Sequence, residues 1–421
     1  MSIELWPLTR RLDFIRQLHD AGQPIGQHQL EFQGNVTFFD VHIVDIGLPC
    51  YRLGNGRTQA AQREIVAREG LDEDFFTADP DSEAALARQE EILRGMVSTG
   101  TDAQILDILR RGQQTQPLIL DRQGYVVNGN RRLCAMRLLY EENATEYARF
   151  QHVQVMFLPP CTQNDIDELE ARLQWLPDGR SDYSWVDKAI VLRQRQQRGW
   201  AVEKIANFYE MTRNEVQLWI AMLEDAEAYL DERGWRGEYS RVLNKQYAFE
   251  QLQRGRKKCD DDEPKKQLFT TMSYVMIDDA DATGRRLYES ISDALKFLDD
   301  IADQVWTDLG DSNGGDETGD GLDILGDGGD SKYIGVIELI RSANSRDTVR
   351  DVIRDKIEEK RRDAREQRDA MYCLREARKA YTSLLNVRSN LGENTETEGL
   401  PALLDNIQAA CDEIRVVLAN G

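Results

Sequence analysis

The chain has 421 residues, enough for two or three domains with their own cores, and 75 acidic against 53 basic residues give a formal net charge of −22. That charge argues against indiscriminate DNA binding, because nonspecific affinity comes mainly from neutralising phosphates. The six cysteines are widely scattered without a Cys-x-x-Cys pair and there are only four histidines, so we expect neither a disulfide framework nor a metal site.

The charge is unevenly distributed along the chain. Residues 260–330 contain 20 acidic and 5 basic residues, a net of −15, whereas residues 181–258 contain 12 acidic and 14 basic residues, a net of +2. Most of the charge that repels DNA therefore lies outside residues 181–258. Charged residues also interrupt the first twenty positions, so no signal peptide or membrane span is expected and we predict a cytoplasmic protein.

The first part of the chain alternates short apolar runs with helical patterns. Residues 41–46 predict a strand, and residues 51–58 predict a loop that contains asparagine and arginine. Residues 60–99 predict a helical insertion. Residues 102–111 predict an amphipathic helix that ends at Gly112.

Two short apolar runs follow and predict a β-hairpin. They cover residues 118–120 and 125–127, and the turn between them contains Gly124. The hairpin leads into Asn128-Gly129, a turn in which the glycine can adopt a positive φ.

The helix after this turn has the composition of an anion site. Its apolar spacing predicts a start near Asn130, where free N–H groups and the helix dipole favour an anion. Arg131 and Arg132 add positive charge at the same end. The alternative is that the two arginines only solvate an exposed helix start.

The elements follow one another as a helix, Gln116-Pro117, a hairpin, an Asn-Gly-Asn-Arg-Arg turn and a second helix. This order resembles the N-terminal domain of ParB-type partition proteins, which is related to sulfiredoxin. The resemblance implies an α/β fold and a bound CTP or ATP, accompanied by Mg²⁺. In that family the Gly-x-Arg-Arg turn holds the triphosphate. The phosphate contacts that the resemblance implies here are Gly129, Asn130, Arg131 and Arg132.

The loop of residues 51–58 resembles the first sequence box of the same family, which makes Asn55 and Arg57 further candidates for the nucleotide pocket. Sulfiredoxins have a nucleophilic cysteine in the phosphate turn, whereas this chain has Asn130, so sulfiredoxin chemistry is not expected. The family's Glu-Asn-x-x-Arg catalytic box has no clean counterpart, since Glu170 and Arg172 are out of pattern. We therefore assign no catalytic residue, and NTPase activity, on CTP or ATP, stays open.

Three helices with helix-turn-helix spacing are predicted next, over residues 187–198, 202–209 and from Thr212 onward. Thr212 and Glu215 match a capping box. Glu210 stands where the turn of such motifs usually has glycine. ParB proteins place a similar helical unit directly after the nucleotide domain, so the resemblance covers about residues 40–230.

The first residues of the second helix face the DNA groove in a helix-turn-helix, which makes Arg213, Asn214 and Gln217 the candidates for contacts with base edges. Arg193 and Arg195 are the candidates for phosphate contacts. The alternative is a three-helix packing module that touches no DNA.

The remaining chain is predicted to be acidic and helical. Residues 254–264 predict a linker whose charge changes sign, and residues 287–306 a strong amphipathic helix. The Gly/Asp-rich residues 309–331 predict a flexible loop, which does not match a calcium-binding EF-hand. Residues 334–386 predict one or two long helices and residues 400–418 a last amphipathic helix.

We therefore expect a ParB/sulfiredoxin-like α/β nucleotide-binding domain with a helical insertion (1–165), a helix-turn-helix domain (181–257) and an acidic helical C-terminal domain (258–421). The expected function is nucleotide-regulated DNA binding by a homodimer. One alternative is a ParB-like ATPase or nuclease of a DNA-modification or phage-defence system. Another is an adaptor with a vestigial pocket, whose C-terminal helices bind partner proteins.

Overall fold

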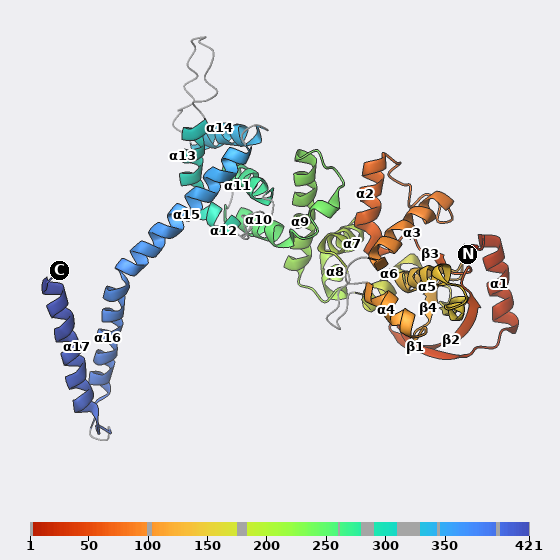
Figure 1. Cartoon of the computed structure of the whole chain (residues 1–421), viewed down its shortest axis with the longest axis horizontal. Coiled ribbons are helices and arrows are strands. Elements are labelled where there is room, and N and C mark those ends of the chain that lie inside the picture. Colours follow the sequence, from red (N-terminus) through yellow and green to blue (C-terminus); the bar gives the residue numbers. More distant parts are fainter. Residues whose placement is uncertain are drawn as a thin grey trace, which may run out of the picture.

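The computed structural model describes residues 3–98, 103–174, 183–259, 262–278, 290–309, 329–342, 346–392 and 396–420. Figure 1 shows an elongated molecule. A part that contains a β-sheet carries the N-terminus at one end, a bundle of helices forms the middle, and a helical hairpin carries the C-terminus at the other end.

The sheet is mixed and has six strands in the order β1-β2-β6-β4-β5-β3. The strands are β1 (Gly26–Phe32), β2 (Asn35–Asp45), β3 (Cys50–Tyr51), β4 (Leu118–Leu120), β5 (Tyr125–Asn128) and β6 (His152–Phe157). Strands β4 and β5 pair antiparallel, which confirms the predicted hairpin. The strand predicted at 41–46 is the second half of a longer β2, which pairs antiparallel with β1 in a hairpin that we did not predict.

Helices cover both faces of this sheet. The helices of this part are α1 (Leu8–Ala21), α2 (Gln59–Glu69), α3 (Glu83–Ser98), α4 (Ala103–Arg111), α5 (Asn130–Glu142) and α6 (Gln163–Gln174). On one face Leu118 and Val126 pack with Leu133 of α5, and on the other Ile119 packs with Leu169 of α6. The mixed α/β class is as predicted, and the predicted insertion and amphipathic helix correspond to α2, α3 and α4.

The rest of the chain is helical. Its helices are α7 (Trp185–Gln197), α8 (Val202–Phe208), α9 (Arg213–Glu232), α10 (Gln246–Lys258), α11 (Glu263–Ile277), α12 (Ile291–Lys296), α13 (Leu298–Leu309), α14 (Gly329–Arg341), α15 (Arg346–Ala370), α16 (Tyr372–Asn390) and α17 (Leu400–Asn420). One buried cluster extends from Trp185 in α7 to Ile357 in α15 and also includes Ala60 of α2. The boundary predicted between residues 257 and 258 falls inside the chain segment that builds this cluster.

Two predictions for this half were wrong. Residues 254–258 are not a linker but the last turns of α10, because Leu252 and Gly255 pack into the helical core, and Asp262 already caps α11. The helix predicted over 287–306 is divided at Phe297 into α12 and α13. Most of the Gly/Asp-rich loop, residues 310–328, lies outside the described residues.

Candidate functional site

The six residues predicted to bind a nucleotide line one cavity of about 510 Å³. We call it the Arg132 cavity. Asn55 and Arg57 enter from the segment between β3 and α2, whereas Gly129, Asn130, Arg131 and Arg132 form the start of α5. Two segments more than seventy residues apart in sequence therefore meet around one space, and its volume lies in the usual range of ligand pockets, about 300–1,000 Å³.

The turn at Gly129 positions this end of α5. Gly129 is the N-cap with φ 109°, and no side chain caps the helix there. A Cβ atom at this position would lie 2.5 Å from Cδ2 of Leu118 and 3.2 Å from Nη2 of Arg132. The first N–H groups of a helix have no acceptor within the helix, which makes a helix start a favourable place for an anionic ligand.

Arg132 carries a positive charge that no described carboxylate neutralises. Its guanidinium donates to the carbonyl oxygen of Gln116 at 2.8 Å and to Oδ1 of Asn128 at 3.1 Å, both of which are uncharged. Burial lowers the pKa of Arg132 to about 10. A cation that is partly desolvated without a counter-ion is stabilised by an anionic ligand.

The segment that carries Asn55 and Arg57 is held by local hydrogen bonds. Oδ1 of the buried Asn55 accepts from the backbone N–H of Arg57 at 3.1 Å and thereby caps a short 3₁₀ turn, residues 56–58. The guanidinium of Arg57 lies 5.4 Å from the ring centroid of Tyr183. Asn55 is therefore a structural cap within the cavity wall as well as a candidate ligand contact.

Part of the lining of the Arg132 cavity is apolar. Ile105, Ile108 and Leu109 of α4 line it together with Met136 of α5 and Leu173 of α6. Ile108, an apolar residue of the amphipathic helix α4, is 64% exposed. The cavity thus combines a cationic side at the start of α5 with an apolar side on α4.

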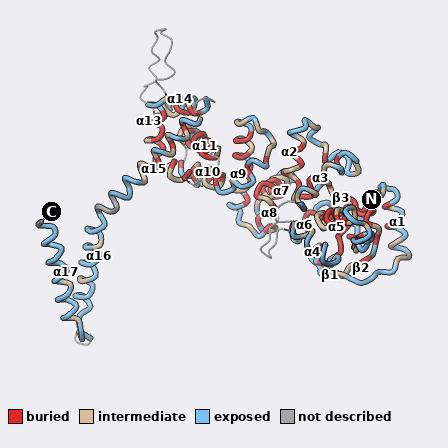
Figure 2. The backbone as a smooth tube through the Cα atoms, in the orientation of Figure 1, coloured by how far each residue is buried: buried red, intermediate tan, exposed pale blue. Residues whose placement is uncertain are grey.

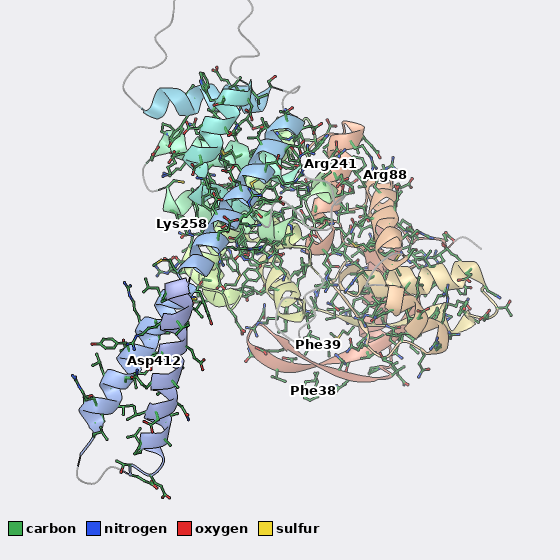
Figure 3. The ribbon with its side chains drawn as sticks, turned by 60° about the vertical axis from the view of Figure 1, so that its left-hand side comes forward. Phe38, Phe39, Arg88, Arg241, Lys258 and Asp412 are labelled. Carbon is green, nitrogen blue, oxygen red and sulfur yellow. The ribbon has the colours of Figure 1, made fainter. Side chains whose placement is uncertain are left out.

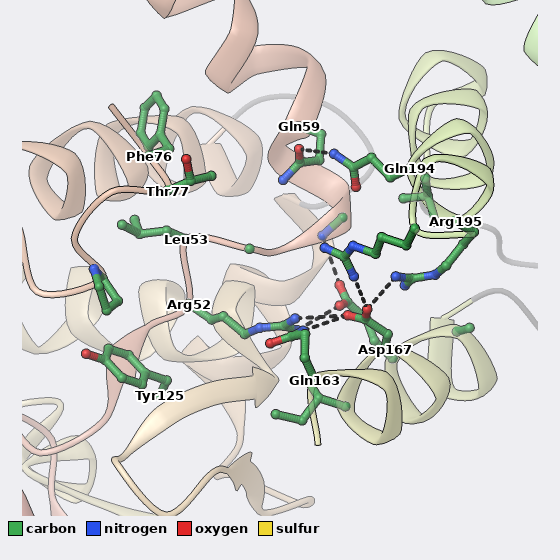
Figure 4. A pocket seen from close by; sticks show the side chains of 18 of the residues that line it. Arg52, Leu53, Gln59, Phe76, Thr77, Tyr125, Gln163, Asp167, Gln194 and Arg195 are labelled. Atoms are coloured by element: carbon green, nitrogen blue, oxygen red, sulfur yellow. Dashed lines mark hydrogen bonds and ion pairs between the residues drawn. The ribbon is translucent and has the colours of Figure 1, made fainter. Parts of the chain in front are cut away.

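A second cavity, of about 430 Å³, lies where the sheet-containing part meets α7, and we call it the Asp167 cavity (Figure 4). Asp167 of α6 forms ion pairs with Arg52, Arg195 and Arg198, the last at 2.5 Å. Glu170, one turn further along α6, pairs with Arg52 at 2.9 Å. Asp167 therefore connects the segment after β3 with α7, and Glu170 adds a second carboxylate beside Arg52.

Sequence reasoning did not find the Asp167 cavity, since its ion pairs join residues 115 and 28 positions apart. Glu170 accepts from the backbone N–H of Gly56 at 3.0 Å and from the hydroxyl of Tyr183 at 3.2 Å, so it supports the segment of Asn55 and Arg57 from behind. Arg172 pairs with Glu31 on β1. Neither Glu170 nor Arg172 lines the Arg132 cavity.

The three helices predicted after residue 185 are present as α7, α8 and α9. Ile205 and Ala206 of α8 pack against Val216 of α9. The capping box of Thr212 and Glu215 is confirmed. Glu210 has φ 52°, so the chain does adopt the left-handed conformation at the position where a glycine was missing.

The candidate DNA contacts divide into two groups. Arg213, Asn214 and Gln217 are exposed on the first turns of α9, where Arg213 forms an ion pair with Glu203 at 3.0 Å. Arg193 and Arg195 have internal partners instead. Arg193 pairs with both carboxylate oxygens of Glu227, at 2.5 and 2.6 Å, and Arg195 is buried against Asp167 and Tyr209.

Within the described ranges, no group of three or more His, Cys, Asp or Glu side chains is arranged to hold a metal ion. Of the helices in those ranges, none combines the length and the apolar composition that crossing a membrane requires. Fold and site define a mixed α/β protein with a ligand-sized, cation-lined cavity at a helix N-terminus. Comparison with family models, curated proteins and solved structures found no match.

Proposed function

We propose that the chain is a ParB-type, nucleotide-regulated DNA-binding protein that holds a nucleoside triphosphate, CTP or ATP, in the Arg132 cavity. The observation that carries the proposal is the convergence of all six candidate residues on one cavity of ligand size. In this proposal the sheet-containing part has the ParB/sulfiredoxin-like fold.

The two sides of the cavity suit the two parts of a nucleotide. The phosphates lie at the start of α5, where backbone N–H groups and Arg132 supply donors and positive charge. Mg²⁺ accompanies them as a ligand of the phosphate oxygens rather than in a site of its own. The base lies against the apolar lining of Ile105 and Ile108.

The described lining of the Arg132 cavity contains no carboxylate. A general base is therefore missing from the described wall, which favours a nucleotide that acts as a regulatory ligand over one that is rapidly hydrolysed. Regulation requires that the nucleotide bind two conformations of the protein with unequal affinity. The segment of residues 52–59 is the place for such coupling, since it lines both cavities and Gln59 accepts a hydrogen bond from Gln194 of α7, the first helix of the helix-turn-helix unit.

The direct test is a panel of nucleotides, with binding and phosphate release measured with and without DNA. Arg132→Ala should weaken triphosphate binding by about tenfold to about a hundredfold, because one charge-assisted hydrogen bond contributes about 1.5–3 kcal/mol. Arg16→Ala, on the exposed side of α1, serves as the matched control. Absence of binding to every nucleotide, or unchanged affinity in a folded Arg132→Ala variant, would contradict the proposal.

The same experiment tests DNA binding with variants of α9. Changing Arg213, Asn214 and Gln217 to alanine should relax sequence preference and weaken specific complexes, because each bidentate base contact contributes about 1–3 kcal/mol. Measurement at several salt concentrations separates this effect from general phosphate attraction. If the wild-type chain bound no duplex at low salt with or without nucleotide, the DNA part of the proposal would be rejected.

A further inference from the structure

The strand β1 forms one edge of the sheet, and no described strand pairs with its outer side. It has seven residues, and its register with β2 continues without a shift from Gly26 to Phe32. Sheets usually protect an edge with lysine, with proline or by keeping the edge strand very short. β1 contains neither lysine nor proline. Such an edge is able to pair with another extended chain.

The turn of the β1–β2 hairpin determines which backbone groups of β1 point outward. Gln33 and Gly34 form a two-residue turn with φ 51° and 75°, and positive φ at both positions is the type I′ geometry. The turn's own hydrogen bond then joins Phe32 and Asn35, and bonded and non-bonded pairs alternate along the ladder from there. The residues whose N–H and C=O groups face the free edge are Gln27, Gln29 and Glu31.

The two faces of this hairpin differ. On the inner face Leu30 and Phe32 are buried together with Phe39 against α6. On the outer face Val36 and Phe38 are each 61% exposed. Figure 2 shows exposed residues along the hairpin, and Figure 3 labels Phe38 and Phe39, which lie on opposite faces because neighbouring side chains of a strand alternate. A strand added beyond β1 therefore needs apolar side chains on the α6 side and polar ones on the other.

The chain around this edge is acidic. Residues 17–51 contain four acidic residues and neither lysine nor arginine, a net of −4. On the hairpin, Glu31 forms an ion pair with Arg172 of α6, whereas the described partner of Asp40 is the uncharged side-chain amide of Gln27 at 3.0 Å. This charge repels a second copy of the same strand and attracts a basic one.

We propose that the outer edge of β1 binds an extended segment of a partner protein in which apolar residues alternate with lysine or arginine. The segment adds a strand to the sheet, and its main chain pairs with the outward N–H and C=O groups of β1. Its apolar side chains extend the core against α6. Its basic side chains lie on the face of Glu31 and Asp40, and their aliphatic stems extend over β1 toward Phe38.

The probe is a labelled synthetic peptide of seven residues, the length of β1, that alternates valine and lysine. Its binding to the full-length chain is measured by fluorescence anisotropy. A peptide with glutamate in place of lysine should bind at least about tenfold more weakly, because the charge attraction becomes repulsion. This binding does not depend on the Arg132 cavity, so its failure and that of the proposed nucleotide site are separate results.

Two further peptides distinguish strand pairing from general charge attraction. One is methylated at the backbone nitrogens of its lysines and the other at those of its valines, so that charge and side chains are the same in both. In an added strand alternate N–H groups face β1. We therefore expect one of the two peptides to bind at least about tenfold more weakly and the other to keep its affinity.

A variant of the chain tests the same edge. Gln29→Pro removes an N–H that points outward and leaves the pairing with β2 in place, so it should weaken peptide binding at least about tenfold. Gln29→Thr keeps the N–H and is the matched control. In the wild-type chain, the peptide should slow the amide hydrogen exchange of Gln27, Gln29 and Glu31, as measured by NMR.

The proposal is overturned if the valine–lysine peptide does not bind, or if the two methylated peptides have equal affinities. Unchanged amide exchange in β1 on peptide binding would overturn it as well. Self-association of the wild-type chain that Gln29→Pro abolishes, observed by sedimentation, would show that a second copy occupies the edge instead of a basic partner.

Discussion

At the scale of single residues, the candidate site depends on Gly129 for two separate reasons. Its φ of 109° is disfavoured for any residue with a side chain, and the space where a Cβ would lie is occupied by Leu118 and Arg132. Gly199 has a φ of 84° but open space around its Cβ position. A comparison of substitutions at these two glycines therefore separates the effect of backbone strain from the effect of a steric clash.

We expect Gly129→Ala and Gly199→Ala both to reduce the free energy of unfolding by about 1 kcal/mol through the positive φ. Gly129→Ala should reduce it further and should weaken nucleotide binding, because Leu118 or Arg132 must move. Denaturant titration and nucleotide titration of the two variants check this. Equal effects of both variants on nucleotide affinity would show that the crowding at Gly129 has no role in the site.

The second prediction at this scale concerns Asp187, a buried carboxylate that accepts from the backbone N–H of Ala60 and from the hydroxyl of Ser184. Burial raises the pKa of Asp187 from 3.8 to about 6. A folded-state pKa above the unfolded value means that the folded protein gains stability from this group at low pH and loses it as pH rises through 6.

Asp187→Asn keeps the acceptor for Ala60 and removes the ionisation. We therefore expect the variant to be more stable than wild type at pH 8, by up to about 3 kcal/mol, since one pKa unit corresponds to 1.36 kcal/mol. The difference should vanish below about pH 3, where both states are protonated. The measurement is the free energy of unfolding of both proteins across this pH range, and a difference independent of pH would argue against the assignment.

At the scale of elements, the turn between α8 and α9 is the place where the helix-turn-helix departs from its usual sequence. Glu210 adopts φ 52°, and the chain closes the turn with a hydrogen bond from the N–H of Met211 to the carbonyl of Ala206. The left-handed conformation costs a residue with a side chain about 1 kcal/mol or more. Glycine avoids that cost.

Glu210→Gly should therefore raise the free energy of unfolding by about 0.5–1 kcal/mol, even though glycine usually destabilises a protein. A suitable control is Glu203→Gly inside α8, which should lower stability by about 1 kcal/mol. Thermal or denaturant unfolding of both variants shows whether each substitution raises or lowers the free energy of unfolding. A loss of stability in Glu210→Gly would mean that the glutamate side chain contributes more than the conformation costs.

Much of this local structure could be predicted from the sequence. The β4–β5 hairpin, the start of α5 at Asn130 and the capping box of Thr212 depend on residues within a few positions of one another, and all three were confirmed. The environment of Arg195 could not be predicted, since its partner Asp167 lies 28 positions away on another helix.

At the scale of the whole molecule, the described chain has two large cores. One joins the sheet to α5, and the other extends from Trp185 to Ile357 through the helical middle part. Ile353 on α15 is fully buried in the second core although it lies more than 160 positions from Trp185. The helical part is therefore expected to unfold as one cooperative unit.

We expect two transitions in scanning calorimetry. Ile353→Ala should lower only the transition of the helical part, by an amount equivalent to about 2–5 kcal/mol, because it leaves a cavity in that core. A nucleotide that binds the Arg132 cavity should raise only the other transition. A single transition that responds to both changes would show that the two cores unfold together.

The long helix α15 has a consequence for the hairpin of α16 and α17. Its first half is anchored in the helical core through Val349, Ile353 and Ile357, and its second half leads to α16 (Figure 1). With 25 residues it is about 38 Å long, which makes it a semi-rigid tether. A molecule bound to α16 and α17 is therefore held within a limited distance of α9, at a high effective concentration there.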